Sequence, residues 1–348
     1  MKKGFALVMA SMMALSLTAC GGNGSSATTA ADTSAADTKA EGTTAAVPAD
    51  KIGLAGSGKE LIFTTGGDQG TYYGFGSVLA GQISDMTDTT VTAIVGKGSK
   101  GNIEAMDAGD AQLGFVQSDV MAYAYNGTNL FDGAKVDGFS TVAALYMEQV
   151  QIVTLNPDIK TVADLKGKTV SVGDSGSGVY FNALDCLGAY GLTIDDITPT
   201  YQSFGDSVEA MQDGKIDAAF IVAGAPTTAV TSLAATRKVY LVELDDEHID
   251  KLIEASPYYS KYTIAKDAYG LDADATTVAV GAVVVARDDV DENDIYNVVA
   301  GIYDSIDTLG HDKKNELDLD FAASVTAVPY HKGAAKYFAE KGLTVPTK

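Results

Sequence analysis

The sequence predicts an α/β protein with largely parallel sheets, built in two lobes. From Glu60 onward, short runs of β-branched and apolar residues alternate with helically spaced segments, which is the pattern of repeated β-α-β units. The segment 59–348 is longer than one typical domain, and its length therefore favours two lobes. Glycine-rich turns separate most of the expected strands from the helices that follow them.

The first elements alternate in this way from residue 60. We expect a strand over 60–65 and then a helix over 71–83 with one apolar face. A second strand over 90–96 leads into a glycine-rich turn and a short helix within 97–110. A third strand over 111–119 ends in polar residues.

The next part of the chain repeats this plan after a long apolar run over 141–155. A β-branched strand over 169–173 breaks at the glycines of "GDSGSG", and a helix is expected to begin near Gly178. The segment 203–226 then reads as a helix, a DGKID turn, a strand and a glycine loop. Within it, residues 207–224 echo the order of elements in 102–119, as two lobes built on one plan would.

Three further elements complete the expected fold. A strongly apolar strand lies within 276–290, and an amphipathic helix follows over 292–309. The tail over 330–342 predicts a closing helix.

The N-terminal residues predict a lipoprotein leader and a tether. Residues 1–20 combine two lysines, a short apolar stretch and Leu17-Thr18-Ala19-Cys20, which resembles a bacterial lipobox whose cysteine is lipidated. The alternative is an ordinary secretory signal with an incidental cysteine. Residues 21–58 have almost no large apolar side chains and are expected to form a disordered tether. These features imply an extracytoplasmic protein held at the membrane by acyl chains on Cys20.

The composition of the chain after the leader argues against several classes of partner. The formal net charge is −22, or −24 without Lys2 and Lys3, which argues against nucleic acid and anionic lipid as partners. No later apolar run approaches the 18 residues of a membrane span. Cys186 is the only cysteine after the leader and has helical neighbours, so we expect it in the core.

Several motifs resemble catalytic or cofactor sites but lack essential parts. "GLAGSGK" at 53–59 fits a phosphate loop, but Glu60 stands where Ser or Thr is needed. "GDSG" at 173–176 resembles a serine-protease motif, but all three histidines follow Ser175. No metal-ligand spacing and no ordered G-x-G-x-x-G occur. We therefore expect no enzyme activity, no catalytic residue, no metal and no cofactor.

Glycine- and hydroxyl-rich loops at the carboxyl ends of strands predict a ligand cleft between the lobes. In open α/β sheets, ligands bind at these strand ends, where backbone N–H groups and helix dipoles favour an anion. The loops are "TTGGDQGTYY", "GKGSKGN", "VQSD", "GDSGSGVY" and "VAGAP".

The charged residues indicate how an acid would be held. The only two arginines, Arg237 and Arg287, lie outside these loops, so a bidentate arginine clamp is not expected. Asp68 would repel a carboxylate but suit an ammonium group, a combination that fits an amino acid. The expected donors are the amides of Gly176 to Gly178, the hydroxyls of Tyr72, Tyr73, Ser99, Ser175 and Ser177, and Lys97.

From residue 60 to the C-terminus the sequence resembles the TAXI family, the solute receptors of one class of TRAP transporter. The resemblance rests on "TTGGDQGTYYGFG", "GSKGNIEAMDAGDAQLGFVQSD", "ALYMEQVQIV", "TVADLKGKTVSVGDSGSG", "KIDAAFIVAGAP" and "PYHKGAAKYF". It implies a two-lobed, type II periplasmic-binding-protein fold that closes on a small organic acid or a glutamate-like amino acid. It also implies delivery of this solute to a membrane permease. The same fold would serve a receptor of an ABC importer or a ligand-sensing lipoprotein.

The resemblance and the loops together give lobes and candidate ligand residues. Lobe 1 is expected over 59–147 and 266–348 and lobe 2 over 148–265, with crossings near 146–151 and 262–267. The candidate ligand residues are Gly67, Asp68, Gly70, Thr71, Tyr72, Tyr73, Lys97, Ser99, Asn102, Gln117, Ser118, Tyr146, Glu148, Ser175, Gly176, Ser177, Gly178, Gly224, Ala225 and Pro226.

Overall fold

The computed structural model describes residues 47–348, except for the side chain of Leu130. The expected leader, Cys20 and the tether up to residue 46 lie outside the described residues.

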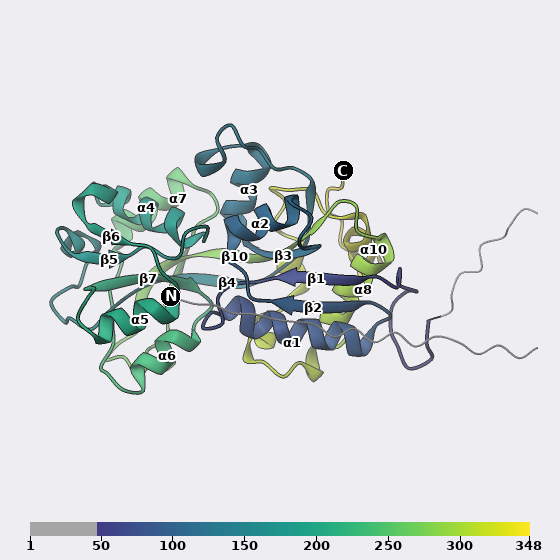
Figure 1. The fold of residues 1–348 in the computed structure, drawn as a ribbon, viewed down its shortest axis with the longest axis horizontal. Helices are drawn as coiled ribbons and strands as arrows, with labels where there is room; N and C mark the ends of the chain where they lie inside the picture. The colour runs from purple at the N-terminus through teal and green to yellow at the C-terminus, as the bar shows by residue number, and fades with distance from the viewer. Residues whose placement is uncertain (1–46) are drawn as a thin grey trace, which may run out of the picture. The chain divides into compact units, whose positions relative to one another are not determined.

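One mixed sheet forms the centre of the described chain, with the strand order β2-β1-β3-β10-β4-β7-β5-β6 (Figure 1). β8 and β9 pair with β4 and β10 beside this path. The strands are β1 (Glu60–Thr64), β2 (Thr90–Ile94), β3 (Leu113–Gln117), β4 (Phe139–Thr154), β5 (Thr169–Ser171), β6 (Thr198–Thr200), β7 (Ala218–Ala223), β8 (Tyr240–Leu241), β9 (Ser260–Ile264) and β10 (Ala275–Arg287).

Helices cover both faces of the sheet, as Figure 1 shows for α1 against α2 and α3, and for α5 and α6 against α4 and α7. Most of them directly follow a strand, as the alternating sequence pattern predicted. The helices are α1 (Thr71–Met86), α2 (Ser99–Asp107), α3 (Ser118–Asn126), α4 (Val179–Ala189), α5 (Phe204–Gln212), α6 (Thr228–Ala234), α7 (Asp246–Ala255), α8 (Glu292–Tyr303), α9 (Leu319–Ala322) and α10 (Lys332–Glu340). The helix expected over 292–309 ends earlier, at Tyr303.

Two long strands join two parallel parts of the sheet. β1, β2 and β3 are parallel to one another, as are β5, β6 and β7. β4 pairs antiparallel with β10 through 139–149 and with β7 through 149–154. The α/β class is thus confirmed, and β10 returns between β3 and β4 as in a type II periplasmic binding protein. We call the β1–β3 side the first half and the β5–β7 side the second half.

The long strands also show where the chain passes between the halves. β4 changes partner near residue 149, within the expected first crossing. The segment 262–267, expected as the second crossing, includes the end of β9 and the turn after it, and β9 pairs with 275–279 of β10. β10 pairs with β3 only over 282–286. The lobe boundaries themselves stay a prediction.

The echo between 102–119 and 207–224 corresponds to two matching structural units. Each consists of a helix, a tight turn and a strand: α2 leads to β3 and α5 leads to β7. Each turn contains a glycine with positive φ, Gly109 at 87° and Gly214 at 69°. Residues that carry a side chain rarely adopt a positive φ, which accounts for a glycine at the same point of both units.

Residues 52–57, which the sequence assigned to the tether, are held against α8. The Leu54 N–H donates to Asn297 Oδ1 (2.7 Å), and the Ser57 N–H donates to Asp294 Oδ1 (3.2 Å). A side chain at Gly56 would collide with the Asp88 carbonyl oxygen, 2.0 Å from an ideal Cβ. Gly56 of "GLAGSGK" therefore serves close packing in this segment.

Candidate solute-binding site

A pocket lies where the loops that follow the parallel strands of both halves meet. It encloses about 80 Å³. One wall comes from the loops after β1 and β2 and the end of β3, and the facing wall from the loops after β5 and β6 and the end of β7. Its lining residues are Gly66, Gly67, Asp68, Gln69, Gly70, Thr71, Tyr72, Gly96, Lys97, Gly98, Ser99, Gln117, Glu148, Asp174, Ser177, Gly178, Val179, Ser203, Phe204, Gly205, Val222 and Ala223.

Three helices begin at this pocket with a glycine that offers no side-chain cap. The N-caps of α1, α2 and α4 are Gly70, Gly98 and Gly178. The first N–H groups of a helix have no intrahelical acceptor, and its N-terminus carries partial positive charge. A fourth helix, α5, also begins here but is capped by its own Ser203 hydroxyl. Among the helices whose N-caps lie outside the pocket, α7, α8, α9 and α10 have side-chain caps, and α6 does not.

Glu148 and Tyr72 are a hydrogen-bonded pair among the buried residues that line the pocket. Glu148 is 2% exposed, and the Tyr72 hydroxyl donates to its Oε2 at 2.6 Å. Burial raises the pKa of Glu148 to about 8, although the Tyr72 hydrogen bond opposes this shift. The neutral acid therefore predominates at pH 7, and Glu148 does not repel an anion there.

The two halves touch directly beside the pocket. Gln117 Nε2 donates to Asn182 Oδ1 (3.1 Å), and Asn182 Nδ2 donates to Asp119 Oδ2 (3.0 Å). The Gly101 N–H also donates to the Gly176 carbonyl oxygen at 2.9 Å. Asp119 is fully buried, and this burial raises its pKa to about 7. Gln117, Asp119 and Gly101 belong to the first half and their partners to the second, so the structure is a closed form.

The pocket brings together more than half of the candidate ligand residues. Those that line it are Gly67, Asp68, Gly70, Thr71, Tyr72, Lys97, Ser99, Gln117, Glu148, Ser177 and Gly178. Those that do not are Tyr73, Asn102, Ser118, Tyr146, Ser175, Gly176, Gly224, Ala225 and Pro226. Which of them bind a solute stays a proposal.

Two of the candidates outside the lining are engaged within the fold. Asn102 Nδ2 donates to the carbonyl oxygens of Thr65 (2.6 Å) and Phe115 (2.7 Å), so it ties α2 to two strands. The Ser118 hydroxyl accepts from the Gly281 N–H at 3.0 Å. When two polar residues are adjacent at a strand end, such as Gln117 and Ser118, the sequence does not show which of them faces the cleft. Neighbouring side chains point in different directions, so only one of the two lines it.

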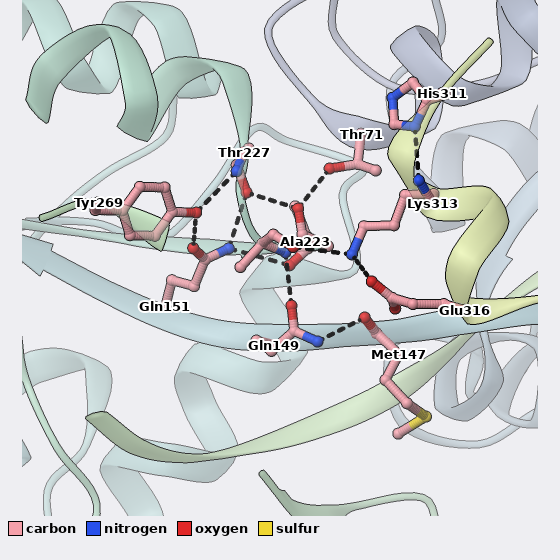
Figure 2. A network of polar contacts seen from close by, with 12 residues as sticks. Thr71, Met147, Gln149, Gln151, Ala223, Thr227, Tyr269, His311, Lys313 and Glu316 are labelled. Atoms are coloured by element: carbon pink, nitrogen blue, oxygen red, sulfur yellow. Dashed lines mark hydrogen bonds and ion pairs between the residues drawn. The ribbon is translucent and has the colours of Figure 1, made fainter. Parts of the chain in front are cut away.

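Residues 224–226 of the "VAGAP" loop do not line the pocket. Polar contacts hold this part of the loop (Figure 2). The Gly224 carbonyl oxygen accepts from the Thr71 hydroxyl (2.8 Å), and the Ala225 N–H donates to Gln149 Oε1 (2.6 Å). Lys313 Nζ donates to the Ala225 carbonyl oxygen at 2.9 Å. These backbone groups already have partners, so we leave 224–226 out of the proposed ligand set.

Sequence reasoning missed the contribution of Ser203, Phe204 and Gly205. They form the start of α5, which faces the pocket beside the starts of α1, α2 and α4. The echo between 102–119 and 207–224 was the available signal, because 207–224 begins within α5, and α2, the counterpart of α5, begins at the glycine loop around Ser99.

Cys186 lies apart from the pocket. Cys186 is fully buried in the apolar core of the second half. Over residues 47–348, no group of three His, Cys, Asp or Glu side chains could hold a metal ion. In the same part of the chain, no helix has the length and apolar character needed to cross a membrane.

A family model described as the NMT1-like family matches residues 63–342. The chain belongs to the NMT1-like family. The match covers both walls of the pocket, since it begins in β1 and ends after α10.

A curated relative and several solved structures are similar to this NMT1-like protein. The putative aliphatic sulfonates-binding protein of Escherichia coli (strain K12) is 43% identical over 70 residues, which are 20% of this chain and 22% of that protein. The crystal structure of SsuA, the periplasmic aliphatic sulphonate binding protein of Escherichia coli, has a TM-score of 0.44 at 19% identity and covers 80% of this chain and 78% of its own. PhnD1 from Prochlorococcus marinus, in complex with methylphosphonate, has a TM-score of 0.45 at 12% identity, with 76% and 89% covered.

Proposed function

We propose that this NMT1-like protein is an extracytoplasmic receptor that captures a small anionic solute in the pocket between its halves. The observation that carries the proposal is the convergence of three glycine-capped helix N-termini, from both halves, on one small pocket. Because the solute would contact both halves, it would bind the closed form better than the open one. No bond is made or broken in this process.

The proposed ligand set follows from the pocket lining. The first amides of α1, α2 and α4 and the Ser177 hydroxyl would donate to the anionic group. Ser177 Oγ is buried and has no hydrogen-bond partner among the described residues, so it is available to a solute. Lys97 is exposed at the rim, where it would attract an anion. Organic acids, acidic amino acids and sulfonates all present such a group, and the curated sulfonate-binding relative supports this class.

The partner would be a membrane permease, with the receptor held to the membrane through Cys20. Of the two transporter classes, an ABC importer is better supported than the TRAP permease implied by the TAXI resemblance. Neither the NMT1-like match nor the sulfonate-binding relative is specific to TRAP systems. Crosslinking in native membranes followed by mass spectrometry would distinguish them: an ATPase subunit indicates an ABC importer, and a large multi-span permease alone indicates a TRAP system.

Mass spectrometry of small molecules released from the denatured, purified full chain is the direct test. We expect an acid or sulfonate in stoichiometric amount. In parallel, thermal unfolding is measured with ethanesulfonate, succinate and L-glutamate, because a solute that binds only the folded state raises the melting temperature. Ethyl methyl sulfone, an uncharged analogue of ethanesulfonate, is the control for charge.

The proposal requires that at least one anion raises the melting temperature while the uncharged sulfone does not. A neutral released solute, or equal effects of ethanesulfonate and the sulfone, would contradict an anion receptor. Absence of any released solute and of any shift would contradict solute binding altogether.

A further inference from the structure

Lys313 is a buried lysine in the turn Asp312–Glu316, and its ammonium points from the first half toward the second. Its side chain is 4% exposed. It lies over the ring of Tyr146, a core residue of the first half, with 5.3 Å from Nζ to the ring centroid. It forms an ion pair with Glu316, and Nζ also donates to the Ala225 carbonyl oxygen in the second half. A buried ammonium needs such partners, because leaving it unpaired is costly.

The first half donates hydrogen bonds to two successive carbonyl oxygens of the loop that contains Ala225. The Gly224 carbonyl oxygen accepts from Thr71, the first residue of α1, and the next carbonyl oxygen accepts from Lys313. Figure 2 shows Thr71 and Lys313 approaching this loop together, with Glu316 beside Lys313. An added Cβ at Gly224 would lie 2.5 Å from Lys313 Cε, so the loop and the lysine are in close contact.

The same loop continues directly from one wall of the pocket. Val222 and Ala223 line the pocket at the end of β7, while Thr71 and Tyr72 line the facing side. The position of the loop therefore determines how closely the two walls approach. Lys313 itself does not line the pocket.

We propose that Lys313 is a positioning residue for solute capture, which holds the Gly224–Pro226 loop of the second half against the first half in the closed form. It acts through the Ala225 carbonyl and not through the solute. This inference rests on the proposed receptor function, in which closure accompanies binding. Sequence reasoning gave no role to the segment between α8 and α9 that carries Lys313.

The test measures the distance between the halves by pulsed spin-label spectroscopy in ligand-free protein, from which any co-purified solute has been removed by unfolding and refolding. Labels are placed at Asp107→Cys, at the end of α2, and at Gln212→Cys, at the end of α5; both positions are exposed. Of the two native cysteines, Cys20 is replaced by serine so that it cannot be labelled. Cys186 is kept because it is fully buried. The variants are Lys313→Met, Lys313→Arg and Lys314→Met in the full chain.

Lys314 is a matched control because it is the next residue, and its Nζ bonds only within the first half, to the Asp307 carbonyl oxygen (3.1 Å). We expect Lys313→Met to lower the ratio of closed to open protein about tenfold, the factor typical of one charge-assisted hydrogen bond. Lys313→Arg should restore most of the closed population, and Lys314→Met should leave it unchanged.

A purely structural role would have a different signature. Lys313→Met would then lower the melting temperature without changing the distance distribution, and this result would overturn the proposal. Equal effects of Lys313→Met and Lys314→Met would overturn it as well. Because no solute is present, the distances stay interpretable even if every solute in the binding panel fails, so the two proposals fail separately.

Discussion

Gly178 shows how one residue can serve both the solute and the closed form. It is the N-cap of α4, so its position brings the first amides of this helix to the pocket. An added Cβ would lie 1.7 Å from Gln117 Oε1 and 3.0 Å from Ser99 Oγ, both of which belong to the first half. Gln117 is 2% exposed and bonded to Asn182, so it has little room to move. The absence of a side chain at 178 is thus a condition for closure.

We predict that Gly178→Ala shifts ligand-free protein toward the open form, about tenfold in the closed-to-open ratio, as overpacking of a tight contact would. The spin-label distance described for Lys313 measures this ratio. Gly188→Ala on the same helix is the control, because nothing lies within 4 Å of its added Cβ. In the Gln117→Ala variant the colliding side chain is absent. Adding Gly178→Ala to it should therefore leave its closed-to-open ratio unchanged. If Gly178→Ala opens the Gln117→Ala variant as much as it opens the wild type, the collision with Gln117 is not the cause.

At the scale of elements, α4 has two functions at different points of its length. Its first turn faces the pocket, while Phe181, Ala183, Cys186 and Leu187 are buried. This division explains why a thiol near a proposed binding site is not part of it. Burial also raises the pKa of the Cys186 thiol, which keeps it protonated and unreactive.

We predict that Cys186 reacts with a thiol reagent only when the second half unfolds. Labelling of the native protein should be slow and should accelerate in parallel with loss of helical signal in urea. Cys186→Ser should cost about 1–3 kcal/mol of unfolding free energy, because its hydroxyl would lack a partner in an apolar core. Cys186→Ala is the reference for lost volume. Fast native labelling that an anionic solute blocks would instead place the thiol in the pocket.

At the scale of the whole molecule, closure buries two carboxyl groups with raised pKa values. Glu148 lies in the pocket and Asp119 in the contact between the halves. Burial raises their pKa values to about 8 and about 7, whereas both groups titrate near pH 4 in an unfolded chain. Between about pH 4 and pH 8, the folded protein therefore still holds protons that the unfolded chain has already released. The resulting stabilisation is complete below pH 4 and is lost as the pH rises through 7 and 8.

We predict that the free energy of unfolding falls between pH 5 and pH 8, by about 1.4 kcal/mol per pH unit for each such group. Glu148→Gln should remove the part of the slope that extends to pH 8, and Asp119→Asn the part that ends near pH 7. Urea unfolding of wild type and variants across this range measures the difference, so that contributions of other groups cancel. Curves that run parallel would show that neither carboxyl holds an extra proton in the folded state.

The sequence by itself determined the α/β class, most strands and helices, and the loops that meet at the pocket. It could do so because the alternation of apolar runs and helical spacing is local, and because Gly70 and Gly178 lie next to the helices that they start. The order of the loops along the chain also placed residues such as Thr71, Ser99 and Ser177 at strand ends that face one another.

Only the tertiary structure decided which side chains at those strand ends are free to meet a solute. Asn102 and Ser118 are polar and correctly placed along the chain, but their hydrogen bonds are used within the first half. The Gly224–Pro226 loop is occupied by Thr71 and Lys313, which lie 153 and 88 positions away in the sequence. Contacts between such distant residues depend on how β4 and β10 bring the halves together, and no local pattern records them.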